Sequence, residues 1–205
     1  MKYENSSEQE LIRAVLEGDK EAFDRLLRPY IRPMYGISYR MLNSEEDAKD
    51  VCQESMIKIY KHLASFQAES KFFTWVYRIT VNCAKDLIKK RYREESLSLE
   101  EELEDAGEGL WNRSERKAET PEASLQRREL YEEIMETLMQ LPTDLRSAIV
   151  LRDVEGFSYA EISEILESNI NTVKSKVSRA RKLAIKSLTA KGIAPGSYEK
   201  EHLYE

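Results

Sequence analysis

The chain has few of the residues that interrupt helices, cross-link a fold or bind metals. Its 205 residues include 7 glycines, 5 prolines, 2 cysteines and 2 histidines. The low glycine and proline content excludes collagen-like and low-complexity chains. Cys52 and Cys83 form no Cys-x-x-Cys pair, so neither a disulfide framework nor a zinc site is expected. We therefore expect no metal site and no cofactor.

Long apolar stretches are also missing. No run of about 18 apolar residues occurs, which excludes a membrane-spanning helix on grounds of length. The first ten residues carry acidic side chains instead of the basic end and apolar stretch of a secretory signal. We expect a cytoplasmic protein, whose length fits one or two domains of about 70 to 150 residues each.

Charge is distributed unevenly along the chain, whose formal net charge is −6. Residues 94–126 hold eleven acidic and three basic side chains, so their net charge is −8 and the remainder carries +2. This segment contains Gly107, Gly109 and Pro121 and has no sustained hydrophobic period. It is typical of a flexible acidic linker.

Helical periodicity on both sides of the linker predicts an all-α fold of two helical domains. The first domain covers residues 7–93, the linker 94–126, the second domain 127–190 and a tail 191–205. The capping box of Ser7 and Glu10 opens the first domain.

The other helices of the first domain follow from local signals. The second helix, over about 20–42, contains Pro29 and Pro33, so we expect a kink or break there. Ser44 caps the third helix, and the fourth covers about 72–93.

The second domain has the sequence form of a helix-turn-helix, a DNA-binding motif. Ser158 and Glu161 open its first helix with a capping box, and Asn171 is placed to cap the second helix, over 172–188. That helix carries six basic residues and no acidic one. A basic face can also be simply solvated, but the capped preceding helix and the spacing of the turn favour DNA binding. The apolar side of the second helix is formed by Val173, Val177, Ala180 and Ala184.

The outer side chains of this helix suit different parts of a DNA duplex. Arg179 has the planar fork of donors that bonds guanine in the major groove, whereas Lys174 and Lys182 suit phosphates. Ser175 and Ser178 are small enough to let the helix approach the duplex closely.

Residues 71–93 combine seven basic side chains and one acid with a cluster of aromatic rings. Cations and aromatic faces together suit unpaired bases, because phosphates need positive charge and every base offers a π-face. The alternative is that Phe72 and Trp75 belong to the hydrophobic core. On the preceding helix, Asp47, Asp50, Gln53 and Glu54 form an acidic outer face. This face repels DNA, so it meets either solvent, which charge alone favours, or a basic protein partner.

Four segments stand out along the chain: SEEDAKDVCQE (44–54), FFTWVYRITVN (72–82), LRDVEGFSY (151–159) and TVKSKVSRARK (172–182). Together they resemble bacterial sigma factors of the extracytoplasmic-function group, and they cover both domains in the order that the family has. The aromatic pair Phe72 and Phe73 looks most like the envelope-stress sigma-E branch.

The resemblance implies a transcription initiation factor that is not an enzyme, has no small-molecule substrate and directs core RNA polymerase to promoters. It places the −10 element on the first domain, with the loop 65–71 capturing a flipped base, through Ser65, Phe66, Lys71, Phe72, Trp75, Arg78 and Asn82. It places the −35 element on the second domain, through Arg152, Tyr159, Asn171, Thr172, Lys174, Ser175, Ser178, Arg179 and Lys182. Residues for polymerase docking on the β′ clamp helices are Asp47, Asp50, Gln53 and Glu54.

Further partners are implied in the same way. They are the β flap of polymerase and an anti-sigma factor, often membrane-bound, that controls a stress response and holds the chain at the membrane. The acidic linker is interpreted as a strand that threads a basic channel of the polymerase.

A second interpretation is a stand-alone helix-turn-helix regulator with an N-terminal helical oligomerisation domain. The aromatic and basic helix over 72–93 argues against it, because a repressor does not need one. An enzyme acting on nucleic acid is disfavoured, since the sequence has no glycine-rich phosphate loop and no nucleophile and base arrangement.

Overall fold

The computed structural model describes residues 7–66, 71–97 and 121–193, and every regular element in these ranges is helical. The predicted all-α fold class is confirmed. We call residues 7–97 the first block and residues 121–193 the second block.

The first block contains α1 (Glu8–Leu16), α2 (Lys20–Leu42), α3 (Glu45–His62) and α4 (Phe72–Leu97), with a 3-10 turn, Leu63–Ser65, after α3. Short polar side chains begin these helices as predicted. The Ser7 hydroxyl accepts from the Glu10 amide, the Glu10 carboxylate accepts from the Ser7 amide at 2.8 Å, and the Ser44 hydroxyl accepts from the Asp47 amide at 3.3 Å. These caps satisfy amides that would otherwise lack partners.

Of the predicted kink or break in α2, the break is wrong, because α2 continues as one helix of 23 residues through Pro29 and Pro33. Each proline removes one backbone hydrogen bond. The half of α2 that follows carries Met34, Ile37 and Met41, all of them 0% exposed. Their burial against the other helices outweighs the local cost of the prolines.

The second block contains α5 (Pro121–Met139), α6 (Thr143–Ile149), α7 (Tyr159–Ile165) and α8 (Ile170–Ala190). A π-helical turn, Val150–Val154, continues α6. The capping box of Ser158 and Glu161 opens α7 as predicted. Thus α7, a short turn and α8 form the expected helix-turn-helix.

The ends of the predicted linker are helical, since α4 extends to Leu97 and α5 begins at Pro121. Glu, Arg and Leu favour helix, so a composition that marks a linker does not mark where its flanking helices end. The remaining linker residues, 98–120, lie outside the described residues, as do residues 194–205 of the tail.

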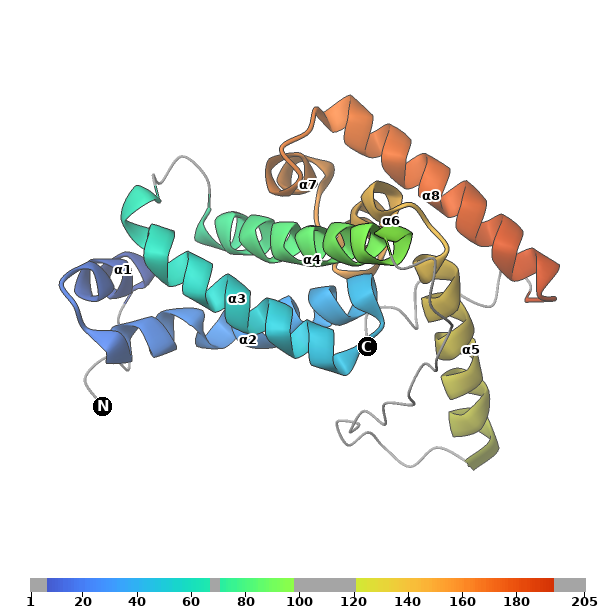
Figure 1. Cartoon of the computed structure of the whole chain (residues 1–205), viewed down its shortest axis with the longest axis horizontal. Helices are drawn as coiled ribbons and strands as arrows, with labels where there is room; N and C mark the ends of the chain where they lie inside the picture. Colours follow the sequence, from blue (N-terminus) through green and yellow to red (C-terminus); the bar gives the residue numbers. More distant parts are fainter. Residues whose placement is uncertain (1–6, 67–70, 98–120, 194–205) are drawn as a thin grey trace.

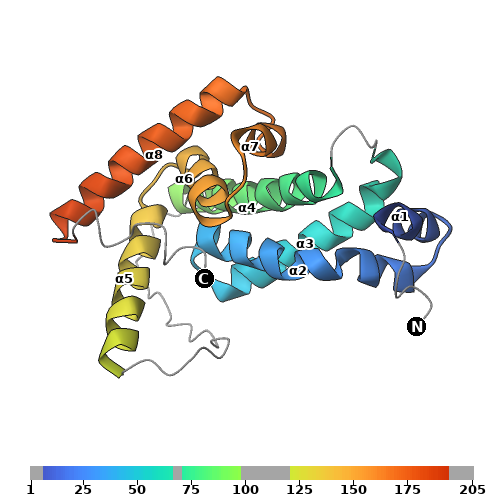
Figure 2. The same ribbon diagram turned by 180° about the vertical axis from the view of Figure 1, so that it is seen from behind.

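The two blocks pack against each other. Figure 1 shows α4 between the other helices of the first block and the helices α6, α7 and α8, and the view from behind in Figure 2 shows the same order. One hydrophobic core includes Val76 of the first block together with Leu151 and Ile162 of the second. The hydrophobic pattern of the sequence predicts helices in both blocks but not this packing between them.

Candidate nucleic-acid interface

The outer face of α8 gathers most of the predicted −35 residues. Val173, Val177 and Ala180 are 0% exposed and fix the helix against the rest of the second block. The opposite side is therefore presented to solvent. Seven predicted residues are exposed there: Asn171, Thr172, Lys174, Ser175, Ser178, Arg179 and Lys182.

The remaining two predicted −35 residues form a stack beside the start of α8. The Arg152 guanidinium lies 4.6 Å from the centroid of the Tyr159 ring, and its Nη1 donates to the Phe157 carbonyl at 2.7 Å. The Lys174 ammonium lies 5.8 Å from the same ring centroid. Cation–π contacts of this kind restrict all three side chains. The ring of Tyr159 thereby holds two cations next to the exposed face of α8.

The start of α8 differs from the prediction by two residues. α8 begins at Ile170, and Asn169 is its cap, with its side-chain oxygen accepting from the Asn171 amide at 2.8 Å. The prediction that Asn171 is the cap is wrong, because Asn171 lies inside α8, whereas Asn169 has the non-helical backbone that a cap needs, with φ −58° and ψ 141°. The preceding turn passes through Glu167 in the left-handed region, at a φ of 46°.

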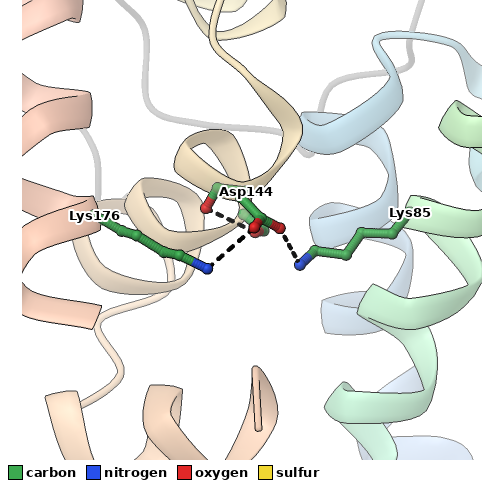
Figure 3. A network of polar contacts seen from close by, with 4 residues as sticks. Lys85, Asp144 and Lys176 are labelled. Carbon is green, nitrogen blue, oxygen red and sulfur yellow. Dashed lines mark hydrogen bonds and ion pairs between the residues drawn. The ribbon is translucent and has the colours of Figure 1, made fainter. Parts of the chain in front are cut away.

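Other basic residues of α8 pair within the protein. Arg181 Nε donates to an oxygen of Asp153 at 2.7 Å. Lys176 Nζ lies 3.1 Å from an oxygen of Asp144, and Lys85 of α4 lies 2.7 Å from the other oxygen (Figure 3). Hydrogen bonds from Lys85 and then Lys176 lower the pKa of Asp144 to about 2. These ion pairs anchor α8 to α6 and to the first block.

Three predicted −10 residues form an aromatic cluster at the start of α4. The ring centroids of Phe66 and Phe72 lie 5.3 Å apart, and those of Phe72 and Trp75 lie 5.7 Å apart. Phe72 is 2% exposed and Trp75 is 7% exposed. In this arrangement, neither buried ring is accessible to a nucleic-acid base. Both rings therefore lie in the hydrophobic core, which was the alternative interpretation of the sequence. Large rings gain more from burial than from exposure at this end of the bundle.

The other four predicted −10 residues lie closer to the surface. Ser65 and Asn82 are exposed, and the Ser65 hydroxyl donates to the His62 carbonyl at 2.7 Å. Lys71 lies 3.7 Å from Glu161, and Arg78 lies 3.2 Å from Glu167. Both acidic partners come from the second block. In the structure, the second block therefore contacts two of the −10 candidates, Lys71 and Arg78.

The acidic face of α3 is smaller than predicted. Asp50, Gln53 and Glu54 are exposed, and Glu54 pairs with Lys58 at 2.8 Å. Asp47 is only 6% exposed and accepts a hydrogen bond from Arg91 of α4. Asp47 therefore ties α3 to α4 within the first block.

A buried cation that was not predicted from the sequence lies between the blocks. Arg146 of α6 donates to the Met41 carbonyl at 2.6 Å, to the Met139 carbonyl at 2.6 Å and to the Leu141 carbonyl at 3.1 Å. Burial lowers the pKa of its guanidinium. Helix ends leave carbonyls without partners, so a cation next to several of them is well placed. No local pattern around Arg146 marks it, because its acceptors are backbone carbonyls and the Met41 carbonyl, which buries it between the blocks, lies 105 residues away.

Neither a metal cluster nor a membrane-spanning helix is found in the described part of the chain. No group of three metal-binding side chains occurs there, and none of its helices is long and apolar enough to cross a membrane.

A two-block helical protein with an exposed basic helix in a helix-turn-helix defines a class of DNA-binding proteins, and family comparisons specify it further. Residues 26–94 match the model of sigma-70 region 2, and residues 131–183 match that of sigma-70 region 4. The chain therefore belongs to the sigma-70 family. Because both blocks match in the order of a sigma factor, the stand-alone regulator is not supported.

Named relatives agree with this assignment. The chain is 37% identical over 181 residues to the RNA polymerase sigma-H factor of Pseudomonas aeruginosa, which covers 88% of this chain and 93% of the relative. It is 39% identical over 184 residues to the ECF RNA polymerase sigma-E factor of Haemophilus influenzae, covering 88% and 94%. The Escherichia coli K12 sigma-E factor is 36% identical over 182 residues, covering 87% and 92%. The resemblance to the extracytoplasmic-function group is confirmed.

Solved structures support the fold. The sigma factor RpoE of Bartonella quintana, solved with the anti-sigma factor NepR, matches with a TM-score of 0.64 and 24% identity, over 82% of this chain and 96% of that one. CnrH, solved with the cytosolic domain of CnrY, matches with a TM-score of 0.64 and 23% identity, over 90% and 99%.

Proposed function

We propose that this sigma factor directs core RNA polymerase to specific promoters by reading the −35 element with α8 and the −10 element with the first block. The observation that carries the proposal is the exposed polar and basic face of α8, fixed from behind by fully buried residues. A rigid helix with small and cationic side chains on one face fits the major groove of duplex DNA.

Roles on the −35 duplex follow from side-chain chemistry. Arg179 reads a guanine through two parallel hydrogen bonds, while Lys174 and Lys182 neutralise phosphates. The contact of Lys174 with the Tyr159 ring supports this role, because it limits the positions available to the ammonium. Arg152 and Tyr159 support the same edge of the interface. Asn171, Thr172, Ser175 and Ser178 complete the contact surface.

The −10 element is contacted by the surface around the start of α4. Lys71, Arg78 and Asn82 bind the unwound strand, and Ser65 belongs to the loop that captures a flipped base. Phe72 and Trp75 act from the core by fixing Phe66 and the start of α4, which their burial supports. Bases of the unwound strand stack on the solvent-accessible aromatic rings of this surface, and this stacking supplies the remaining affinity for the −10 element.

Docking on polymerase uses the outer face of α3. Asp50, Gln53 and Glu54 bind the β′ clamp helices, and the second block binds the β flap. The exposure of these three side chains supports the assignment. Asp47 contributes indirectly by tying α3 to α4.

Regulation involves an anti-sigma factor in a stress response. The structurally similar sigma factor RpoE of Bartonella quintana was solved with the anti-sigma factor NepR, which supports this kind of partner for the present chain. We place the protein in the cytoplasm, held at the membrane when its anti-sigma factor is membrane-bound.

The acidic segment within residues 94–126 threads a basic channel of polymerase, so neutralising residues 100–105 weakens core binding or alters promoter escape. Unchanged behaviour in both assays contradicts this role.

Binding to duplex promoter DNA with and without core polymerase tests the proposal. One helix-turn-helix of this size binds weakly alone, so we expect a stable complex only when polymerase is present. Tight binding by the purified chain alone, unaffected by polymerase, contradicts the proposal and favours an independent regulator.

A further inference from the structure

The second block covers one face of α4 with acidic groups. We define the α4 contact face as Lys71, Phe73, Tyr77, Arg78 and Lys85. Three of its cations meet acids of the second block: Lys71 lies 3.7 Å from Glu161, Arg78 lies 3.2 Å from Glu167, and Lys85 lies 2.7 Å from Asp144 (Figure 3). Every one of these pairs takes its cation from the first block and its anion from the second.

A fourth pair beside this face has the same polarity. Arg40 Nη1 of α2 lies 2.8 Å from Glu155, whose side chain is only 16% exposed. Burial raises the pKa of Glu155, and the charge of Arg40 opposes that rise. Arg40 therefore partly offsets the desolvation cost that Glu155 bears when the two blocks are packed together.

An aromatic ring of the second block lies between these charges. Phe157 stacks on Phe73 with ring centroids 6.0 Å apart and an angle of 7° between the planes. It also contacts the Tyr77 ring at 5.1 Å, and burial raises the pKa of Tyr77 to about 12. A flat ring on an aromatic surface is the contact that an unpaired base makes with a single-strand binding protein.

The second block thus supplies anions to the cations of α4 and a flat ring to its aromatic rings. A DNA strand supplies the same two kinds of group, phosphates and bases. We propose that the second block occupies the single-strand site of α4 as an intramolecular substitute for DNA, so that the closed chain and the −10 strand exclude each other. The inference rests on the proposed function, because it takes α4 as the −10 surface. Arg78 carries the conflict most directly, since its pairing with Glu167 competes with its pairing to a phosphate.

The ion pairs of Glu167 and Asp144 are the part of the contact that is most easily broken. Glu167 and Asp144 have side chains that are 64% and 59% exposed, so their pairs are weak individually and screened by salt. A partner that holds the second block elsewhere breaks these two pairs at little cost, but it must also separate the shared core around Val76 and Leu151.

Two double variants of the full chain with equal charge test the proposal. Asp144→Asn with Glu167→Gln removes two contacts to α4. Glu129→Gln with Glu164→Gln neutralises two other exposed acids of the second block, and within the described residues neither of these pairs with the first block. Because each variant raises the net charge by two, general attraction to DNA rises equally in both.

The measurement is fluorescence anisotropy with a fluorescein-labelled single-stranded thymidine oligonucleotide. We expect the contact variant to bind about tenfold more tightly than the control variant, and its radius of gyration in X-ray scattering to increase. Phe157→Ala changes no charge and should also bind more tightly than the unaltered chain, with circular dichroism checking that each variant is folded. Equal affinities of the two double variants, or no gain from Phe157→Ala, overturn the proposal whether or not the chain expands.

Transcription assays separate this inference from the proposed function. A chain that supports run-off transcription with core polymerase, but whose double variants bind the oligonucleotide equally, contradicts only the intramolecular substitution. A chain that supports no transcription contradicts the function itself, and with it the identity of the α4 site.

Discussion

At the residue scale, we expect single side chains on α8 to determine which promoters are chosen. Arg179 is exposed on the face opposite the buried Val177 and Ala180. Replacing Arg179 by alanine should relax preference at one −35 base by about 1 to 3 kcal/mol, because a bidentate contact to guanine is lost. Arg179→Lys keeps the charge without the planar fork and should lose the same preference. Affinities for a set of promoters altered one base at a time measure both effects; unchanged base preference in both variants contradicts the role.

Lys174 provides the matched comparison on the same face. Lys174→Ala should weaken binding evenly across promoter sequences and reduce the slope of log affinity against log salt by about 0.9, the value for one phosphate contact. Titration of the polymerase complex at several salt concentrations measures this slope. A change confined to one promoter base instead identifies Lys174 as a reader of sequence.

Asp144 makes stability depend on pH. Its pKa of about 2 lies below the ordinary 3.8, chiefly because Lys85 hydrogen-bonds the carboxylate. The stabilisation is therefore present above about pH 4 and is lost as pH falls towards 2. Since the side chain is 59% exposed, we expect about 1 kcal/mol after solvent screening.

Urea unfolding of the unaltered chain and of Asp144→Asn checks this expectation. The difference in unfolding free energy should be constant from neutral pH to about pH 5 and shrink below pH 4. A difference that grows as the solution is acidified contradicts the assignment.

At the scale of elements, two substitutions test which asparagine caps the N-terminus of α8. Asn169→Ala should lower the unfolding free energy by about 1 kcal/mol, because it removes the side-chain acceptor for the Asn171 amide. Asn171→Ala is the control, since its side chain is not the cap. A larger loss of stability in Asn171→Ala than in Asn169→Ala contradicts the observed start of α8.

Local signals were sufficient for most helix starts but not for their exact limits. The caps at Ser7, Ser44 and Ser158 were predictable because donor and acceptor lie within three residues. Two asparagines flank Ile170, and sequence cannot choose between caps that both satisfy the same rule. The continuity of α2 depends on the burial of residues such as Met34 against other helices, which no local pattern reports.

The candidate site was predictable to a similar extent. Exposure of the α8 residues follows from a strict helical period, so sequence placed them correctly on one face. Burial of Asp47 and the contact of Arg78 with Glu167 depend on partners 44 and 89 residues away. Periodicity and motif spacing cannot predict contacts between residues so far apart in the sequence.

At the scale of the whole molecule, Arg146 links the two blocks through the Met41 carbonyl. Arg146→Leu leaves buried carbonyl groups without donors and should lower the unfolding free energy by about 3 kcal/mol. The cost should affect both blocks, because α2, α5 and α6 all meet at this residue. Hydrogen exchange of backbone amides measures where protection is lost; a loss confined to α6 contradicts its linking role.

The account depends on one division of labour, in which the first block binds polymerase and the opened strand while α8 binds intact duplex. Run-off transcription with core polymerase that lacks any specificity subunit, supplied with this chain and a promoter library, tests it most directly. We predict transcripts that begin at defined start sites, are absent without the chain and are redistributed by Arg179→Ala. If the chain fails to direct core polymerase to any start site, the account is contradicted.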